Sequence, residues 1–201
     1  MLNFSEWLSD NYHNLIVVDI QPAYSNSIRF KNEFFSYLKN AVSKNKKIIY
    51  FYNGESLGFD DNPDLIIQWL IEDEYSDDED MESLYSSLKR NIIWFDKGYG
   101  FFRAWMDEGV EDSVIIKVIR YMVSKRINDS RDIEEEVLEY LTGGNYPQHD
   151  PLYMPDISLG TLKQFAGSYM CGGGENECLK EVRILMNAFN INYTLLSRFI
   201  Y

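Results

Sequence analysis

Short runs of β-branched and aromatic residues alternate along the chain with segments whose apolar residues recur at helical spacing. Runs 15–20, 47–52 and 91–95 are apolar on both faces, which is typical of strands buried in a parallel sheet. The segment 27–43 carries apolar residues with the period of an amphipathic helix. Asn62-Pro63 predicts an N-cap followed by proline at the first position of another helix. This alternation predicts right-handed crossovers and a parallel sheet.

The alternation breaks after the third run. The segment 105–141 contains two helical stretches and no clear strand, one over 113–125 and the other from about Asp132. We interpret about 103–145 as a helical insertion that covers a pocket, sets substrate size or forms a subunit interface. The acidic run 72–82 has few apolar residues, so it predicts a solvated loop leading into a helix that ends near residue 90.

The α/β pattern resumes at residue 158. It predicts a helix over 158–165, a strand over 168–171, a glycine turn at 172–174, a helix over 177–189 and a last strand over 193–200. We therefore expect an α/β protein, a three-layer α/β/α sandwich with a mainly parallel sheet and an inserted helical pair. The 201 residues are expected to form one domain.

Composition narrows the class of protein. The chain is 45% hydrophobic and 15% aromatic, which is enough for a core and excludes a disordered chain. The net charge of −13 argues against nucleic-acid partners and against docking on an anionic membrane. Two cysteines are too few for a disulfide framework, and no apolar run is long enough to span a membrane. The N-terminus lacks a signal-peptide pattern, so we expect a soluble, cytoplasmic protein.

Reactive residues follow the predicted strands. Ligands of open α/β sheets bind at the carboxyl ends of the strands, where this sequence places Asp19, Asn53, Lys97 and a glycine turn followed by Cys178. Cys178 is expected in the first turn of a helix, where the helix dipole and a nearby lysine favour a thiolate. A carboxylate could move the proton, and backbone N–H groups beside the glycines could bind an oxyanion. Together these groups describe acyl transfer to a cysteine.

Three motifs in this order resemble those of the isochorismatase-like cysteine hydrolases, which include nicotinamidases. They are Asp19-Ile20-Gln21-Pro22-Ala23-Tyr24, Lys97-Gly98-Tyr99-Gly100-Phe101-Phe102 and the segment from Gly172 to Cys178-Leu179. The resemblance covers about two-thirds of the chain and implies a hydrolase of small amides or related carbonyl compounds, of the nicotinamide or carbamoyl type. Relatives of this kind commonly self-associate, so a homo-oligomer is one expectation.

The resemblance also implies a role for each matched residue. Asp19 would be the general base and then acid, Lys97 the cation that stabilises the thiolate, and Cys178 the nucleophile. The backbone N–H groups of Gly174 and Cys178 would form the oxyanion hole. Substrate-binding residues would come from the same motifs and from the end of the second strand: Gln21, Tyr24, Asn53, Tyr99 and Phe102. The region after the second strand lacks the histidine of the nicotinamidase metal motif, so we expect no metal and no cofactor.

The sequence leaves a second hypothesis open. Glu175 replaces the threonine of the family motif and Glu177 precedes Cys178, and inward-facing carboxylates would raise the pKa of the thiol. The chain could then be a catalytically silent protein of the same fold that acts as an acidic interaction module. Each site residue also has an ordinary interpretation: Asp19 as a cap, Lys97 as a solvated lysine and Cys178 as a small buried residue. A lysine facing solvent would favour the binding hypothesis.

Overall fold

The computed structural model describes residues 13–56, 59–72, 78–98 and 100–201. The chain divides into two compact units. The first, here called the sheet unit, comprises Met1–Gly98, Gly167–Gly173 and Tyr193–Tyr201. The second, here called the helical unit, comprises Tyr99–Ala166 and Gly174–Asn192.

The sheet unit contains five parallel strands in the order β5-β2-β1-β6-β7. The strands are β1 (Leu15–Val18), β2 (Ile48–Tyr52), β5 (Ile92–Asp96), β6 (Ser168–Gly172) and β7 (Tyr193–Leu195). In the centre of the sheet, Val17 lies opposite Tyr50 of β2 and Cys171 of β6. These observations confirm the α/β class and are consistent with the predicted three-layer α/β/α sandwich.

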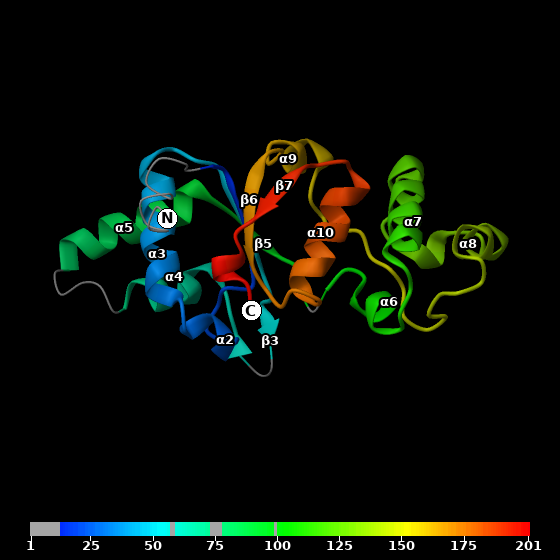
Figure 1. Ribbon diagram of the computed structural model, residues 1–201, viewed down its shortest axis with the longest axis horizontal. Helices are drawn as coiled ribbons and strands as arrows, with labels where there is room; N and C mark the ends of the chain where they lie inside the picture. The colour runs from blue at the N-terminus through cyan, green and yellow to red at the C-terminus, as the bar shows by residue number, and fades with distance from the viewer. Residues whose placement is uncertain (1–12, 57–58, 73–77, 99) are drawn as a thin grey trace, which may run out of the picture. The chain divides into compact units, whose positions relative to one another are not determined.

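Helices α3 (Lys31–Ser43), α4 (Pro63–Ile71) and α5 (Asp78–Asn91) pack together beside these strands (Figure 1). Their apolar side chains, including Phe34 and Leu70, join Val17 and Tyr50 in one buried core. The residues that alternate with Val17 along β1, Ile16 and Val18, are also fully buried. Burial of every β1 residue is the pattern of a central parallel strand covered on both faces, and it explains the continuous apolar run in the sequence.

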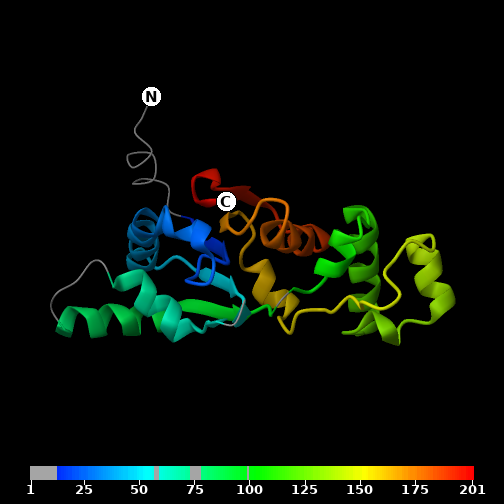
Figure 2. The ribbon, with the colours of Figure 1, turned by 90° about the horizontal axis from the view of Figure 1, so that it is seen from below.

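The helical unit contains α6 (Arg103–Asp107), α7 (Asp112–Lys125), the 3₁₀ turn η1 (Ser130–Asp132), α8 (Glu135–Thr142), α9 (Leu159–Lys163) and α10 (Cys178–Ala188). Helix α7 packs against both α8 and α10, and the two views in Figures 1 and 2 show these neighbours. Its buried face, Ile115, Val118, Ile119 and Met122, has the spacing seen in the sequence.

Several predicted boundaries are wrong for identifiable reasons. The helix expected over 27–43 is broken into α2 (Ser25–Ile28) and α3, because Phe30 has the non-helical backbone angles φ −127° and ψ 10°. The last strand ends at Leu195 rather than near residue 200, and the 3₁₀ turn η2 (Ser197–Phe199) follows it. Packing of the aromatic side chain of Phe199 against Phe34 accounts for the apolar residues in this turn.

Two further features concern the segment after β2. A short antiparallel hairpin, β3 (Glu55–Ser56) with β4 (Phe59–Asp60), was not predicted. The Asn62 cap is confirmed, since its side chain accepts a hydrogen bond of 3.1 Å from the backbone N–H of Leu65 at the start of α4. Part of the acidic run, 73–77, lies outside the described residues.

Candidate functional site

Asp19 stands at the carboxyl end of β1 in a constrained conformation. Its φ of 49° lies in the left-handed region, which ends the strand at Val18. Its backbone N–H donates to the carbonyl oxygen of Phe51, and its own carbonyl accepts a 2.7 Å hydrogen bond from the Tyr201 hydroxyl. The residue is completely buried, so these contacts hold the carboxylate in the interior at the end of the sheet.

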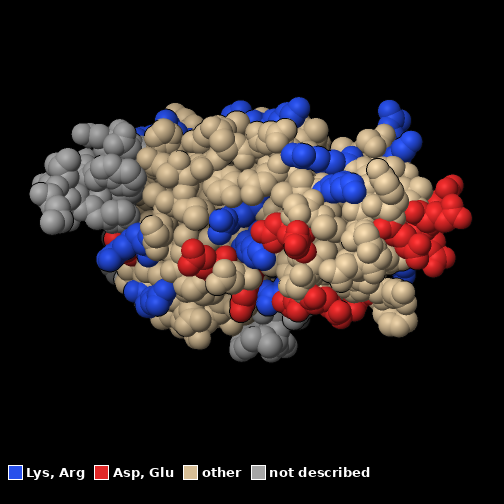
Figure 3. All heavy atoms as spheres, turned by 45° about the vertical axis from the view of Figure 1, so that its right-hand side comes forward, with Lys and Arg blue, Asp and Glu red and all other residues tan. Residues whose placement is uncertain are grey.

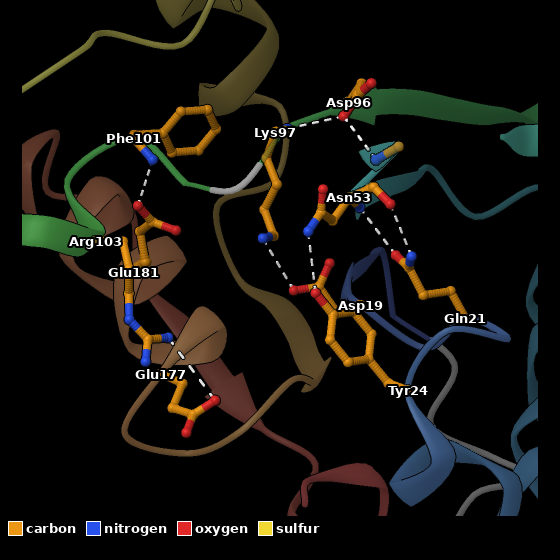
Figure 4. Close-up of polar contacts among 12 residues, drawn as sticks. Asp19, Gln21, Tyr24, Asn53, Asp96, Lys97, Phe101, Arg103, Glu177 and Glu181 are labelled. Atoms are coloured by element: carbon orange, nitrogen blue, oxygen red, sulfur yellow. Dashed lines mark hydrogen bonds and ion pairs between the residues drawn. The ribbon is translucent and has the colours of Figure 1, made fainter. Parts of the chain in front are cut away.

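The side chain of Lys97 reaches that carboxylate. Lys97 follows β5, and its backbone N–H donates to the carbonyl oxygen of Tyr52 on the neighbouring strand. Its Nζ lies 3.1 Å from Oδ2 of Asp19, and both side chains have no exposed surface (Figure 4). Lys97 is therefore buried and ion-paired rather than solvated. Two opposite charges in a dry environment attract strongly, and each would be costly there without the other.

A hydrogen-bonded amide network lies next to the ion pair. The side chain of Gln21 accepts from the backbone N–H of Asn53 and donates to its carbonyl oxygen, both at 2.9 Å. The same Gln21 amide donates to Oδ2 of Asp61 at 2.6 Å. Asn53 in turn donates from its side chain to the Tyr24 hydroxyl at 3.2 Å (Figure 4). The network ties the loop after β1 to the end of β2.

At two glycines near the carboxyl ends of the strands, neighbouring atoms lie too close to leave room for a side chain. Gly172 ends β6 with φ +85°, and a Cβ there would overlap with the carbonyl oxygen of Val18. Gly54 donates its N–H to Oδ1 of Asp96, which also accepts from Gly98. A side chain at residue 54 would collide with the Asp96 carboxylate. Glycine at residue 172, the last position of β6, is therefore required by packing within the sheet, whether or not it also serves a substrate.

Cys178 belongs to the helical unit and is the first residue of α10. Its side chain is partly exposed, whereas Cys171 in β6 is fully buried, and burial raises the pKa of the Cys171 thiol well above its usual value. The backbone carbonyl of Gly174 accepts hydrogen bonds from Glu177 and Leu179, which forms the turn into the helix. Glu177 itself is largely exposed, and its Oε2 lies 3.8 Å from Nη1 of Arg103.

A buried carboxylate lies in the second turn of the same helix. Glu181 is completely buried, and its Oε1 accepts hydrogen bonds from the backbone N–H groups of Phe101 and Phe102, the latter at 2.7 Å. A Cβ at Gly100 would lie 2.9 Å from both Glu181 oxygens. The carboxylate therefore holds the 100–102 segment against α10, as the Phe101 contact in Figure 4 shows.

The predicted site residues fall into two groups. Asp19 with Lys97, and Gln21 with Asn53 and Tyr24, are brought together within the sheet unit. Cys178 and Gly174 lie in the helical unit. The side chain of Phe102, predicted to bind substrate, is buried in that unit. Tyr99 lies outside the described residues.

Four residues that form hydrogen bonds or ion pairs in and around these groups were not predicted from the sequence. They are Asp61, Arg103, Glu181 and Tyr201. A signal existed for Glu181, because it shares the apolar face of α10 with Leu179, Val182 and Leu185, which are all buried. A carboxylate on that face needs buried hydrogen-bond donors. Asp61, Arg103 and Tyr201 carry no comparable pattern.

Charges of both signs lie on the face of the molecule that Figure 3 draws. Figure 3 shows carboxylates in several clusters with lysines and arginines between them on the face drawn. Among the described residues, no group of three or more His, Cys, Asp or Glu side chains is placed to hold a metal ion. A helix long and apolar enough to cross a membrane is also missing from this part of the chain.

Comparisons with protein-family models, with curated proteins and with solved structures found no match for this chain. The fold assignment rests on the strand order and register described above.

Proposed function

We propose that this protein is a cysteine hydrolase of small amides or related carbonyl compounds, in which Cys178 acts with Asp19 and Lys97. The observation that carries the proposal is the fully buried ion pair between Asp19 and Lys97 at the carboxyl end of the parallel sheet. Parallel sheets bind ligands at this edge, and buried ionisable groups cluster at functional sites. The resemblance to isochorismatase-like hydrolases assigns catalytic roles to these same two residues.

Chain connectivity supports the choice of Cys178 as the nucleophile. Gly172 pairs with Val18 across the β1–β6 ladder, and Val18 immediately precedes Asp19. Cys178 follows Gly172 by six residues, and a chain of that length spans at most about 20 Å. The thiol is at the first position of an α-helix, where the dipole favours a thiolate. The proposal requires this thiol to reach the carboxylate of Asp19 during the reaction.

The proposed reaction has two stages, formation of a thioester on Cys178 and hydrolysis of that thioester. Asp19 accepts the thiol proton, and the thiolate of Cys178 attacks the substrate carbonyl. The backbone N–H groups of Gly174 and Cys178 stabilise the resulting oxyanion. Asp19 then returns the proton to the leaving amine, and a thioester remains on Cys178.

In the second stage Asp19 takes a proton from water, which attacks the thioester carbonyl. The carboxylic acid product leaves, and the proton returns to the sulfur. Lys97 keeps its positive charge throughout and offsets the negative charge that moves between Asp19 and the sulfur.

The proposal also covers the substrate class, the cellular compartment and the oligomeric state. The excess of acidic residues supports a small-molecule substrate rather than a nucleic acid. Two cysteines without a disulfide framework fit a reducing compartment, so we place the enzyme in the cytoplasm. Self-association into a homo-oligomer is part of the same proposal because it is common among the proteins that the motifs resemble.

The test is a screen of nicotinamide-type and carbamoyl-type amides for release of ammonia, with acid-quenched mass spectrometry of Cys178. We expect turnover and a thioester adduct on Cys178 in the native protein. Cys178→Ala should abolish both, while Cys171→Ala should retain activity because Cys171 is buried in the sheet. Absence of any adduct on a folded protein whose thiol reacts with iodoacetamide would contradict the proposal and favour the interaction-module hypothesis.

A further inference from the structure

The residue before Cys178 poses an electrostatic problem for a nucleophilic thiol. Glu177 is the N-cap of α10, so its carboxylate belongs to the residue adjacent to the sulfur-bearing one. A negative charge near a thiol disfavours the thiolate and raises the thiol pKa. A positive charge close to this turn would offset that effect and favour the thiolate.

Arg103 occupies the required position. Its Nη1 lies 3.8 Å from Oε2 of Glu177, as Figure 4 shows. Its Nε donates to both carboxylate oxygens of Asp107, at 2.8 and 2.9 Å, which holds the guanidinium in one orientation. Burial opposes the charge of Arg103, but the Asp107 hydrogen bond and the negative charges of Asp107, Glu177 and Cys178 raise the pKa of the guanidinium. Arg103 is thus a permanent cation beside Glu177, the residue that precedes Cys178.

Glu181 anchors the segment that carries Arg103. Its buried carboxylate binds the N–H groups of Phe101 and Phe102, directly before the start of α6 at Arg103. Glu181 and Cys178 are three residues apart on α10 and therefore lie on the same side of the helix. The anchor connects the backbone of the arginine segment to the helix that bears the thiol.

We infer that Arg103 is a positioning residue for the Cys178 thiolate, whose charge offsets that of Glu177 and keeps the thiol reactive near neutral pH. Its catalytic meaning rests on the proposed hydrolase function. The electrostatic relationship itself stands on geometry within the helical unit. In the proposed reaction, Lys97 and Arg103 supply charge to different partners, since Lys97 pairs with Asp19 and Arg103 with Glu177.

Other charged groups also face the N-terminal half of α10. Helix α6 contributes Asp107 beside Arg103, and α7 contributes Asp112, whose Oδ1 lies 2.9 Å from Nζ of Lys180 on α10. Lys180 and Asp112 offset each other, and the Glu181 carboxylate is engaged by two backbone N–H groups. Glu175, in the turn before Cys178, is exposed, and Arg103 with Glu177 forms the ion pair at this turn.

The test is the pH dependence of Cys178 alkylation by iodoacetamide, followed by mass spectrometry. The thiolate forms a carbon–sulfur bond and iodide leaves, so the rate reports the thiolate fraction. Arg103→Gln should move the midpoint of the pH profile upward and slow alkylation at pH 7 about three- to tenfold. Glu177→Gln in the Arg103→Gln background should restore most of the rate, because the charge to be offset is gone.

Two matched variants separate this effect from general damage. Arg103→Lys keeps the charge and should stay close to the native midpoint. Arg120 on α7 donates to the carbonyl oxygen of Ala188 at the opposite end of α10, so Arg120→Gln removes a cation bound to the far end of that helix and should leave the midpoint unchanged. Thermal unfolding of each variant checks that it is folded.

An unchanged midpoint in folded Arg103→Gln, or one that moves equally in Arg120→Gln, would overturn the inference. The measurement needs no substrate, so its outcome is independent of the amide screen. A protein that shows the Arg103 effect but releases no ammonia would retain the electrostatic inference and lose the proposed function.

Discussion

Nζ of Lys97 lies 3.1 Å from Oδ2 of Asp19, and neither side chain has any exposed surface. The two residues are 78 positions apart in the sequence, and the sheet brings them together because β5 and β1 both flank β2. The left-handed backbone at Asp19, with φ 49°, turns the chain at this point. Both a non-glycine residue in that conformation and a buried ion pair are costly features that concentrate at functional sites.

Breaking this pair from one side should be strongly destabilising. Lys97→Met leaves the Asp19 carboxylate buried without its cation, which we expect to lower the free energy of unfolding by about 3–5 kcal/mol. Urea denaturation measures the change. The double variant Asp19→Asn/Lys97→Met removes both charges and should recover much of the loss. A double variant as unstable as the sum of the single variants would show that the two charges are not coupled.

Hydropathy patterns predicted the strands of this fold better than their ends. The continuous apolar runs led to β1 and β2 because these central parallel strands are buried on both faces. The run 91–95 also led to a strand, but β5 lies at the edge of the sheet and is not buried on both faces, since Ile93 is exposed. The Asn62 cap was predictable from a local hydrogen bond. The end of β7 and the break before α3 were not, since tertiary contacts such as Phe34 with Phe199 override the local pattern there.

The candidate site was predictable only in part. Asp19 and Lys97 were chosen because each follows a strand, and the strand order then places them together. The partners of Gln21 lie 32 and 40 positions away along the chain, and those of Glu181 lie 79 and 80 positions away. No local spacing in the sequence records contacts of this kind. The arginine beside Glu177 was missed for the same reason.

Gly172 should tolerate no side chain. Its φ of +85° is a conformation that costs an L-residue about 1–2 kcal/mol, and a Cβ there would also overlap with the Val18 carbonyl oxygen. Gly167 has a similar φ of +78°, but a Cβ at that residue would meet nothing within 4 Å. Gly172→Ala should therefore lower the melting temperature much more than Gly167→Ala. Equal effects in the two variants would argue against the close approach of β1 and β6.

The buried carboxylate of Glu181 should be needed for the stability of the helical unit. Glu181→Ala leaves the N–H groups of Phe101 and Phe102 without this acceptor, which we expect to cost about 1.5–3 kcal/mol. Glu181→Gln keeps an oxygen that can accept and should cost less. Hydrogen exchange of the two amides, measured by NMR, should accelerate more in the alanine variant than in the glutamine variant. Unchanged protection in both would mean that the segment is held by other contacts.

The buried thiol of Cys171 predicts a specific loss of stability at high pH. Burial raises the pKa of this thiol in the folded state above its unfolded value of about 8.5. A raised folded pKa means that the thiol's contribution is fully present below pH of about 8.5. It is lost as the pH rises further, because only the unfolded state then releases the proton, at about 1.4 kcal/mol per pH unit.

Comparison of variants separates the contribution of the Cys171 thiol to stability from the contributions of the other groups that titrate at high pH. The difference in unfolding free energy between the native protein and Cys171→Ala should be constant from pH 7 to 8. It should then fall between pH 9 and 10.5, as measured by urea denaturation. Cys178→Ala retains the buried thiol and should follow the native protein in this range. A Cys171→Ala curve parallel to the native one up to pH 10.5 would show that the β6 thiol ionises within the folded protein, which its complete burial in the sheet argues against.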